Sequence, residues 1–105
     1  MKPRSKSAID ILNREFAGDP KYQAGLAAER IKLQASRAIY DARTAAGLTQ
    51  QDLAKRVGTT QSVIARLEDA DYDGHTLKML NRIAAALGRE VEVRLVPAAL
   101  AHRAS

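Results

Sequence analysis

Apolar and polar residues follow each other with the period of an α-helix over most of this chain. Residues 20–46 contain only one weak helix former, Gly25, and they predict one long helix. Asp19 is placed to cap that helix, and Pro20 takes its first position, where a missing N–H does no harm. A shorter amphipathic helix is predicted before it, with the apolar residues Ile9, Leu12 and Phe16.

Two short helices joined by a glycine are predicted between residues 47 and 68. Thr49 and Asp52 stand three residues apart, nearly as in a capping box, and Thr60 can cap the second helix. Gly58 lies between the two helices, where a chain leaving a helix often needs a positive φ. The apolar residues that bring the helices together are Leu53, Ala54, Val57, Ile64 and Leu67. Two amphipathic helices joined by such a turn form a helix-turn-helix.

The rest of the chain predicts one more helix and then a strand. Apolar residues recur at helical spacing from Leu77 to Leu87, and Gly88 follows them. Residues 90–96 alternate polar and apolar side chains, which is the period of a β-strand, and Pro97 ends the run. A lone strand has no hydrogen-bonding partner within its own chain. The apolar residues that would meet either a second copy of the chain or the sheet edge of another protein are Val91, Val93 and Leu95.

The composition limits the possible functions. A chain of 105 residues fits one small domain with a modest core. Without cysteine it has no disulfide framework, which suits the cytoplasm, and neither a secretory signal nor a membrane span is expected. The net charge of +5 is compatible with a polyanionic partner and equally with ordinary solubility charge. Residues 49–88 hold five basic and five acidic residues, so a nucleic-acid hypothesis depends on the motif rather than on charge.

Nothing in the sequence predicts an enzyme, a cofactor or a metal site. There is no Ser/His/Asp set, no glycine-rich phosphate loop and no carboxylate pair in an apolar setting. His75 and His102 are the only histidines, and a lone histidine without cysteine or a second histidine nearby is not a metal site. Asp69, Asp71 and Asp73 alternate as in a calcium loop, but the closing glutamate of such a loop is missing.

The exposed side of the second short helix indicates DNA binding. Gln61, Ser62 and Arg66 lie on the side away from the apolar residues. Gln and Arg carry paired hydrogen-bonding groups that match the major-groove edges of adenine and guanine. On these residues the segment resembles the helix-turn-helix of the phage-repressor and Cro-like family, often called the XRE family. The resemblance continues from Leu80 to Gly88, and the residues that carry it are Leu48, Thr49, Gln50, Leu53, Ala54, Val57, Gly58 and the stretch from Gln61 to Glu68.

The resemblance implies a sequence-specific repressor whose second helix enters the major groove of double-stranded DNA. Gln61 would contact a base such as adenine, and Arg66 would contact guanine or a phosphate. Ser62 would make an adaptable contact, Val63 would either touch a thymine methyl or pack inside the protein, and Gln50 would face phosphate. One such domain contacts few bases, so we expect a homodimer on a palindromic operator. The predicted DNA-binding residues are Gln50, Thr60, Gln61, Ser62, Val63, Arg66 and Arg43.

Arg43 has two candidate roles. In the XRE family an arginine four residues before the glycine that stands here as Gly47 pairs with the glutamate that ends the recognition helix. Here that resemblance implies an ion pair between Arg43 and Glu68, which would hold the long helix to the second short helix. A contact between Arg43 and DNA is the other role, and a guanidinium has donors enough for both. The loop at residues 69–75 is acidic here, whereas it is basic in many phage repressors, which puts a phosphate contact by this loop in doubt.

The residues before the motif have no evident use in DNA binding alone. The helical lead, the helix-turn-helix, the loop at residues 72–77 and the closing strand together look like the HigA-type antitoxins of type II toxin–antitoxin modules. This resemblance implies a chain that neutralises a RelE-like ribonuclease toxin and represses the shared operon. The alternative is a stand-alone XRE-family regulator in which the apolar residues of the N-terminal helical segment are covered within the chain or by a second copy. The residues expected to meet a toxin are Ile9, Leu12, Phe16, Tyr22, Leu26 and Leu33.

Together these features predict a mainly α fold. It consists of a five-helix, phage-repressor-like helix-turn-helix domain with an N-terminal helical extension and one C-terminal β-strand. We place the arm and extension at residues 1–34, the DNA-binding domain at 35–88, the strand at 89–97 and a flexible tail at 98–105.

Overall fold

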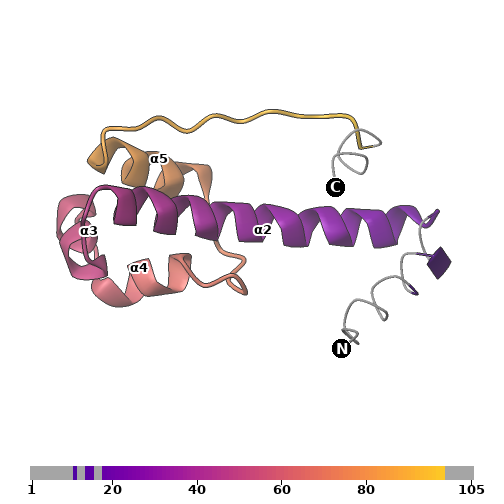
Figure 1. Ribbon diagram of the computed structural model, residues 1–105, viewed down its shortest axis with the longest axis horizontal. Coiled ribbons are helices and arrows are strands. Elements are labelled where there is room, and N and C mark those ends of the chain that lie inside the picture. Colours follow the sequence, from indigo (N-terminus) through magenta and orange to yellow (C-terminus); the bar gives the residue numbers. More distant parts are fainter. Residues whose placement is uncertain (1–10, 12–13, 16–17, 99–105) are drawn as a thin grey trace.

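The computed structural model describes residues 11, 14–15 and 18–98. Four helices are defined within these residues: α2 (Pro20–Ala45), α3 (Gln50–Val57), α4 (Gln61–Leu67) and α5 (Leu77–Ala86). The long helix α2 runs through the molecule, and α3, α4 and α5 gather around its C-terminal half (Figure 1). The short helix expected at residues 9–16 depends on Ile9, Leu12 and Phe16, which lie outside the described residues.

The helices begin and end where local side-chain chemistry requires. The Asp19 carboxylate accepts a hydrogen bond from the Lys21 N–H at 2.9 Å and so caps α2. At the start of α3, Thr49 and Asp52 form both hydrogen bonds of a capping box. Gly58 ends α3 with φ of 84°, a left-handed conformation that glycine adopts without a steric penalty. The predicted long helix, capping box and glycine turn are therefore confirmed.

The core lies where α3, α4 and α5 meet the second half of α2. Leu53 and Ile64 are fully buried, and they join the facing sides of α3 and α4. The other buried apolar residues are Ile39, Ala54, Val57, Leu67 and Ile83. This small core fixes the angle between α3 and α4, which are the two helices of the helix-turn-helix.

The expected count of five helices and the C-terminal β-strand are both wrong for the described residues, which form four helices and no strand. Between α4 and α5 the chain makes the expected turn at residues 69–75, where the Asp69 side chain accepts from the Asp71 N–H at 2.9 Å. Residues 90–96 alternate in sequence like a strand, but they form no hydrogen-bonded ladder with another extended segment among the described residues.

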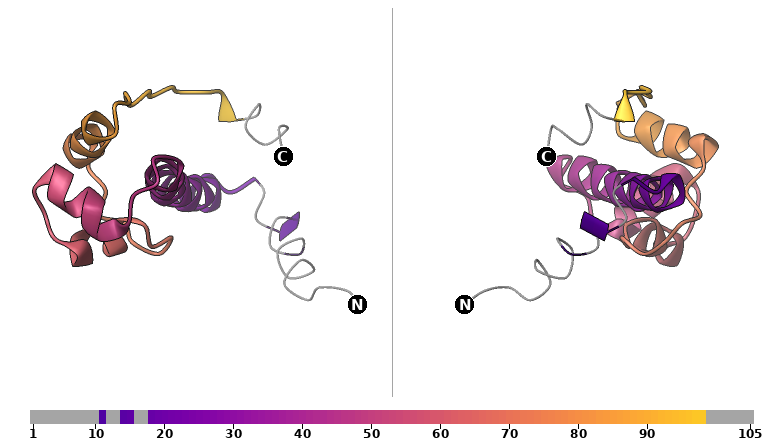
Figure 2. Two further views of the ribbon diagram at one scale, coloured as in Figure 1. Left: turned by 60° about the vertical axis from the view of Figure 1, so that its left-hand side comes forward. Right: turned by 90° about the vertical axis from the view of Figure 1, so that its right-hand side faces the viewer.

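Two parts of the chain reach beyond this core. All the buried residues of α2, namely Ser36, Ile39 and Arg43, belong to its second half, so its first half extends away from the other helices (Figure 1). Residues 89–97, which we call the arm, leave the end of α5 and run without helical turns alongside α2 (Figures 1 and 2). A groove of about 570 Å³ lies between the arm, α2 and α5.

Candidate nucleic-acid interface

Helix α4 presents a polar surface because its apolar side is anchored in the core. Ile64 and Leu67 are buried, whereas Gln61, Ser62 and Arg66 on the other side are exposed. Thr60, also exposed, caps the helix by accepting a hydrogen bond from the Val63 N–H at 3.3 Å. The structure therefore brings the predicted base-contacting residues onto one accessible face of a short, anchored helix.

A chain of side-chain hydrogen bonds joins this face to the interior. The Gln61 amide donates to the Gln50 carbonyl oxygen at 2.6 Å, and the Gln50 amide donates to Glu68 Oε1 at 3.0 Å. Glu68 in turn accepts from Arg43. Both polar atoms of the Gln50 side chain are thus engaged within the protein. Gln50 is the first residue of α3 and holds the Gln61 side chain through this hydrogen bond.

The predicted ion pair between Arg43 and Glu68 is confirmed. Arg43 Nε lies 2.6 Å from Glu68 Oε2, and Arg43 Nη2 lies 3.0 Å from Oε1, which is a two-pronged contact. Arg43 Nη1 also donates to the Leu48 carbonyl at 2.8 Å. The hydrogen bond to Glu68 raises the pKa of Arg43 above its ordinary value, although burial acts in the opposite direction. Arg43 is buried, so its donors position α4 and the α2–α3 turn.

A second clamp at the end of α4 was not predicted from the sequence. His75 Nε2 donates to the Leu67 carbonyl at 2.7 Å, and Ser36 Oγ donates to the Asp69 carbonyl at 2.9 Å. The Tyr72 ring packs edge-on against His75, with 5.2 Å between the ring centroids. The available signal was Ser36, a polar residue within the apolar stripe that packs α2 on the core.

The remaining predicted residues lie in different surroundings. Val63 is half-buried and packs against the core, which favours packing over a contact with thymine. Tyr22 and Leu26 are half-buried on the first half of α2, and Leu33 on the same helix is 51% exposed. Val91, Val93 and Leu95 are exposed on the arm.

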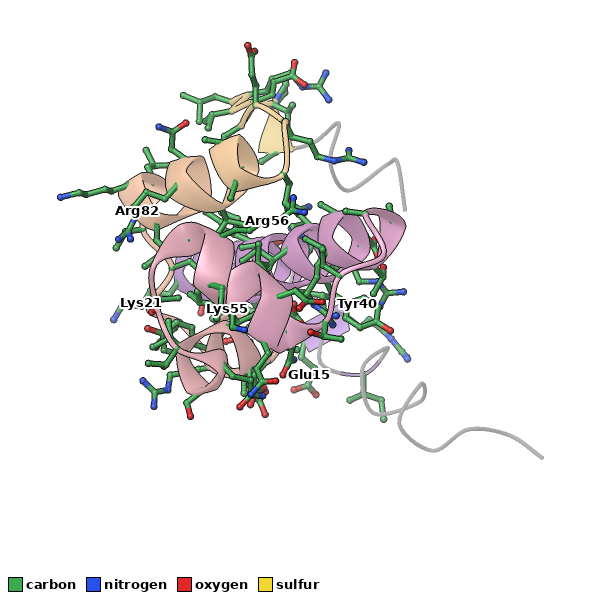
Figure 3. All side chains as sticks on the ribbon, turned by 90° about the vertical axis from the view of Figure 1, so that its left-hand side faces the viewer. Glu15, Lys21, Tyr40, Lys55, Arg56 and Arg82 are labelled. Atoms are coloured by element: carbon green, nitrogen blue, oxygen red, sulfur yellow. The ribbon has the colours of Figure 1, made fainter. Side chains whose placement is uncertain are left out.

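Cationic side chains also lie near the helix-turn-helix. Figure 3 views the molecule from the end where α3 lies, with Lys55 and Arg56 on α3 and Arg82 on α5. Lys55 and Arg56 are exposed in the last turn of α3, where a positive charge interacts favourably with the helix dipole. Arg82 Nη2 donates to the Val57 carbonyl at 2.7 Å, so it fastens α5 to the turn between α3 and α4.

Two negative findings concern the described part of the chain. No group of three or more His, Cys, Asp or Glu side chains there is arranged to hold a metal ion. No helix among the described residues has the length and apolar character needed to cross a membrane.

Comparisons with known proteins match this architecture. A model of a helix-turn-helix domain family matches residues 22–96. An uncharacterised HTH-type transcriptional regulator from Methanothermobacter thermautotrophicus is 48% identical over 52 residues, which cover 50% of this chain and 74% of the relative. No solved structure matches the chain.

Proposed function

The chain belongs to the helix-turn-helix domain family, and on that premise we propose that it is a transcriptional repressor that binds double-stranded DNA through α4. The observation that supports this most directly is the division of α4 into two sides. Ile64 and Leu67 anchor the helix, while Gln61, Ser62 and Arg66 remain exposed. A helix held in this way can enter a major groove and present its side chains to base edges.

The proposed contacts follow from the chemistry of each side chain. Gln61 contacts adenine through its amide, and Arg66 contacts guanine or a neighbouring phosphate. Ser62 and Thr60, which have shorter side chains, make hydrogen bonds to the DNA at the start of α4. Gln50 and Arg43 act through the hydrogen-bonded chain that ends at Gln61, which places them as positioning residues.

One copy of α4 contacts too few base pairs for a specific site, so we propose a homodimer on a palindromic operator. The arm supplies the surface for this assembly, because Val91, Val93 and Leu95 are apolar and exposed.

The test of DNA binding is selection of a preferred sequence from randomised duplexes, followed by titration of variants on that sequence. Gln61→Ala and Arg66→Ala should each weaken binding by about 10- to 100-fold, which corresponds to about 1–3 kcal/mol for each base contact. The matched controls are Gln34→Ala and Arg30→Ala, which remove exposed side chains of the same types from α2. Unchanged affinity of the double variant Gln61→Ala/Arg66→Ala would refute the assignment of α4 as the recognition helix.

A specific observation favours a second role, as the antitoxin of a type II toxin–antitoxin module. The first half of α2 extends beyond the helix-turn-helix core, and Leu33 at its end is 51% exposed. DNA binding through α4 does not use this extension, whereas a small RelE-like toxin could pack against its apolar residues, among them Tyr22 and Leu26. A stand-alone regulator remains the competing proposal.

Co-expression with the neighbouring reading frame separates these two proposals. An antitoxin should copurify with the product of that frame and relieve its toxicity. Leu26→Glu/Leu33→Glu should abolish both effects and leave operator binding unchanged. Gln61→Ala/Arg66→Ala should do the reverse. A neighbouring product that neither binds the chain nor arrests growth would favour the stand-alone regulator.

A further inference from the structure

Among the described residues, the arm is joined to the rest of the chain by a backbone hydrogen bond at its first residue alone. The Arg89 N–H donates to the Ala84 carbonyl at 2.8 Å, and residues 90–96 form no backbone hydrogen bond within the described part of the chain. Val93 is 64% exposed and Leu95 is 98% exposed. Unpaired backbone groups beside exposed apolar side chains are a template for pairing with another extended segment.

The side chains of the arm alternate in a regular way. Val91, Val93 and Leu95 occupy the odd positions, and Glu90, Glu92 and Arg94 occupy the even positions. Within one copy, Glu92 and Arg94 are both highly exposed, and their closest charged atoms are 4.0 Å apart. An ion pair this exposed contributes little within one chain, so both charges are available to another partner.

We propose that the arms of two copies of this chain pair antiparallel, in one register, with Val93 of each copy opposite Val93 of the other. This proposal rests on the homodimer of the proposed function and specifies its seam. In this register Glu92 of each copy lies opposite Arg94 of the other, which makes two ion pairs between the copies. Val91 of each copy likewise lies opposite Leu95 of the other.

Other antiparallel registers are disfavoured by charge or by pattern. Pairing centred on Glu92 sets the two Glu92 carboxylates opposite each other, and pairing centred on Arg94 does the same for the two guanidinium groups. A shift by a single residue sets apolar side chains opposite charged ones, because the side chains of an extended segment alternate between faces. The register centred on Val93 therefore pairs Glu92 with Arg94 and Val91 with Leu95, and sets a charged residue opposite an apolar one only at the ends, where Glu90 faces Val96.

The groove beside the arm adds a reason for a second copy to bind there. Ile31 of α2 and Leu77 of α5 line this groove and are 63% and 66% exposed. A second arm laid along the first widens the apolar cover next to these residues. Burial of apolar surface then stabilises the pair in addition to the backbone hydrogen bonds.

The natural chain has no cysteine, so one introduced thiol reports the register without interference. Directly opposite residues of antiparallel strands have Cα atoms about 4.5–5.5 Å apart, within the range of a disulfide. Val93→Cys should therefore form a disulfide-linked dimer under mild oxidation. Val91→Cys and Leu95→Cys are the matched controls, because each lies about 13 Å from its own counterpart in this register. A mixture of the two controls should cross-link.

Charge reversal tests the same register without a covalent cross-link. Glu92→Arg and Arg94→Glu should each raise the dimer dissociation constant about tenfold, since each replaces two attractive pairs by two repulsive ones. The double variant Glu92→Arg/Arg94→Glu should restore wild-type dimerisation, and an equimolar mixture of the single variants should form mixed dimers. Sedimentation equilibrium measures each constant.

The results separate this proposal from the proposed function. Each of three results would overturn the proposed register. They are a cross-link formed by Val91→Cys on its own, a charge-reversal double variant that dimerises as weakly as the single variants, and a wild-type chain that is monomeric. Cross-linked Val93→Cys that selects no DNA sequence would support the seam and refute the operator-binding function. Specific DNA binding by a chain that does not cross-link at position 93 would do the opposite.

Discussion

Arg43 and Glu68 form a two-pronged ion pair that joins α2 to the end of α4. Their side chains are only 11% and 5% exposed, and Arg43 Nε lies 2.6 Å from Glu68 Oε2. Glu68 also accepts the Gln50 amide, so one carboxylate receives hydrogen bonds from α2 and α3. The orientation of the proposed recognition helix therefore depends on one buried acidic group.

Removing one partner of this pair should cost more stability than removing both. Arg43→Met leaves an unpaired buried carboxylate, and Glu68→Leu leaves an unpaired guanidinium, so each should lower the free energy of unfolding by about 3–5 kcal/mol. The double variant Arg43→Met/Glu68→Leu should lose clearly less than the sum of the two. Urea denaturation followed by circular dichroism measures all three variants. Additive losses would show that the two charges do not interact in solution.

Gln50→Met should impair sequence recognition more than folding. Methionine has a similar length but cannot accept the hydrogen bond from Gln61 or donate to Glu68. We expect stability to fall by about 1 kcal/mol. Affinity for the selected operator should fall several-fold, whereas affinity for random DNA should stay the same.

Gln51→Met provides the matched control for Gln50→Met, since Gln51 is its neighbour on α3 and is exposed. Equal effects of the two substitutions on operator affinity would argue against a positioning role for Gln50.

The capping box of α3 should give stability a specific dependence on pH. The backbone and hydroxyl hydrogen bonds from Thr49, aided by Lys55 and Arg56, lower the pKa of Asp52 below its ordinary value. The folded state thus binds this proton less readily than the unfolded state. The stabilisation is present above the ordinary carboxyl range and is lost as the pH falls from about 4 through the lower folded pKa.

Asp52→Asn should consequently be less stable than wild type at pH 7, and the difference should vanish in strong acid. Thermal unfolding at pH values between 7 and 2 measures it. Asp71→Asn, which changes a carboxylate outside any capping box, is the control. A gap between wild type and Asp52→Asn that persists unchanged to pH 2 would contradict the role of the Asp52 charge.

Two glycines should respond to alanine in opposite directions. Gly58→Ala should destabilise the fold by about 1–2 kcal/mol, since φ at this position is 84° and an added Cβ is strained there. Gly25→Ala should increase helix stability by about 0.5–1 kcal/mol, because Gly25 lies inside α2 with open space around it. Far-UV circular dichroism during heating follows both variants. A stabilising Gly58→Ala would contradict the turn geometry.

Features set by neighbouring residues were predictable from the sequence. The caps at Asp19 and Thr49, the glycine turn at Gly58 and the apolar faces of the helices all depend on residues a few positions apart. The Arg43–Glu68 pair, 25 residues apart, was expected only because of a family resemblance. The hydrogen bond from Gln61 to Gln50 had no local signal, because it depends on how α3 and α4 pack.

The strand prediction failed for a physical reason. The alternation of polar and apolar residues at 90–96 indicates which side chains share a face. A strand also needs a neighbouring segment with which to exchange hydrogen bonds. No such segment exists within the described part of this chain. The described residues form four helices instead of five, and the other expected helix, at residues 9–16, depends on Ile9, Leu12 and Phe16, which lie outside them.

The length of α2 has a consequence for simultaneous occupancy. A 26-residue α-helix spans about 39 Å, and Tyr22 stands about 32 Å along it from Arg43. A protein bound around Tyr22 and Leu26 would therefore leave uncovered the face of α4 that we propose enters the major groove. Operator and protein partner need not compete for this chain, and a ternary complex is the geometry that the helix permits. Control of transcription by such a partner would then act through the number of copies held together on one operator, not through displacement from DNA.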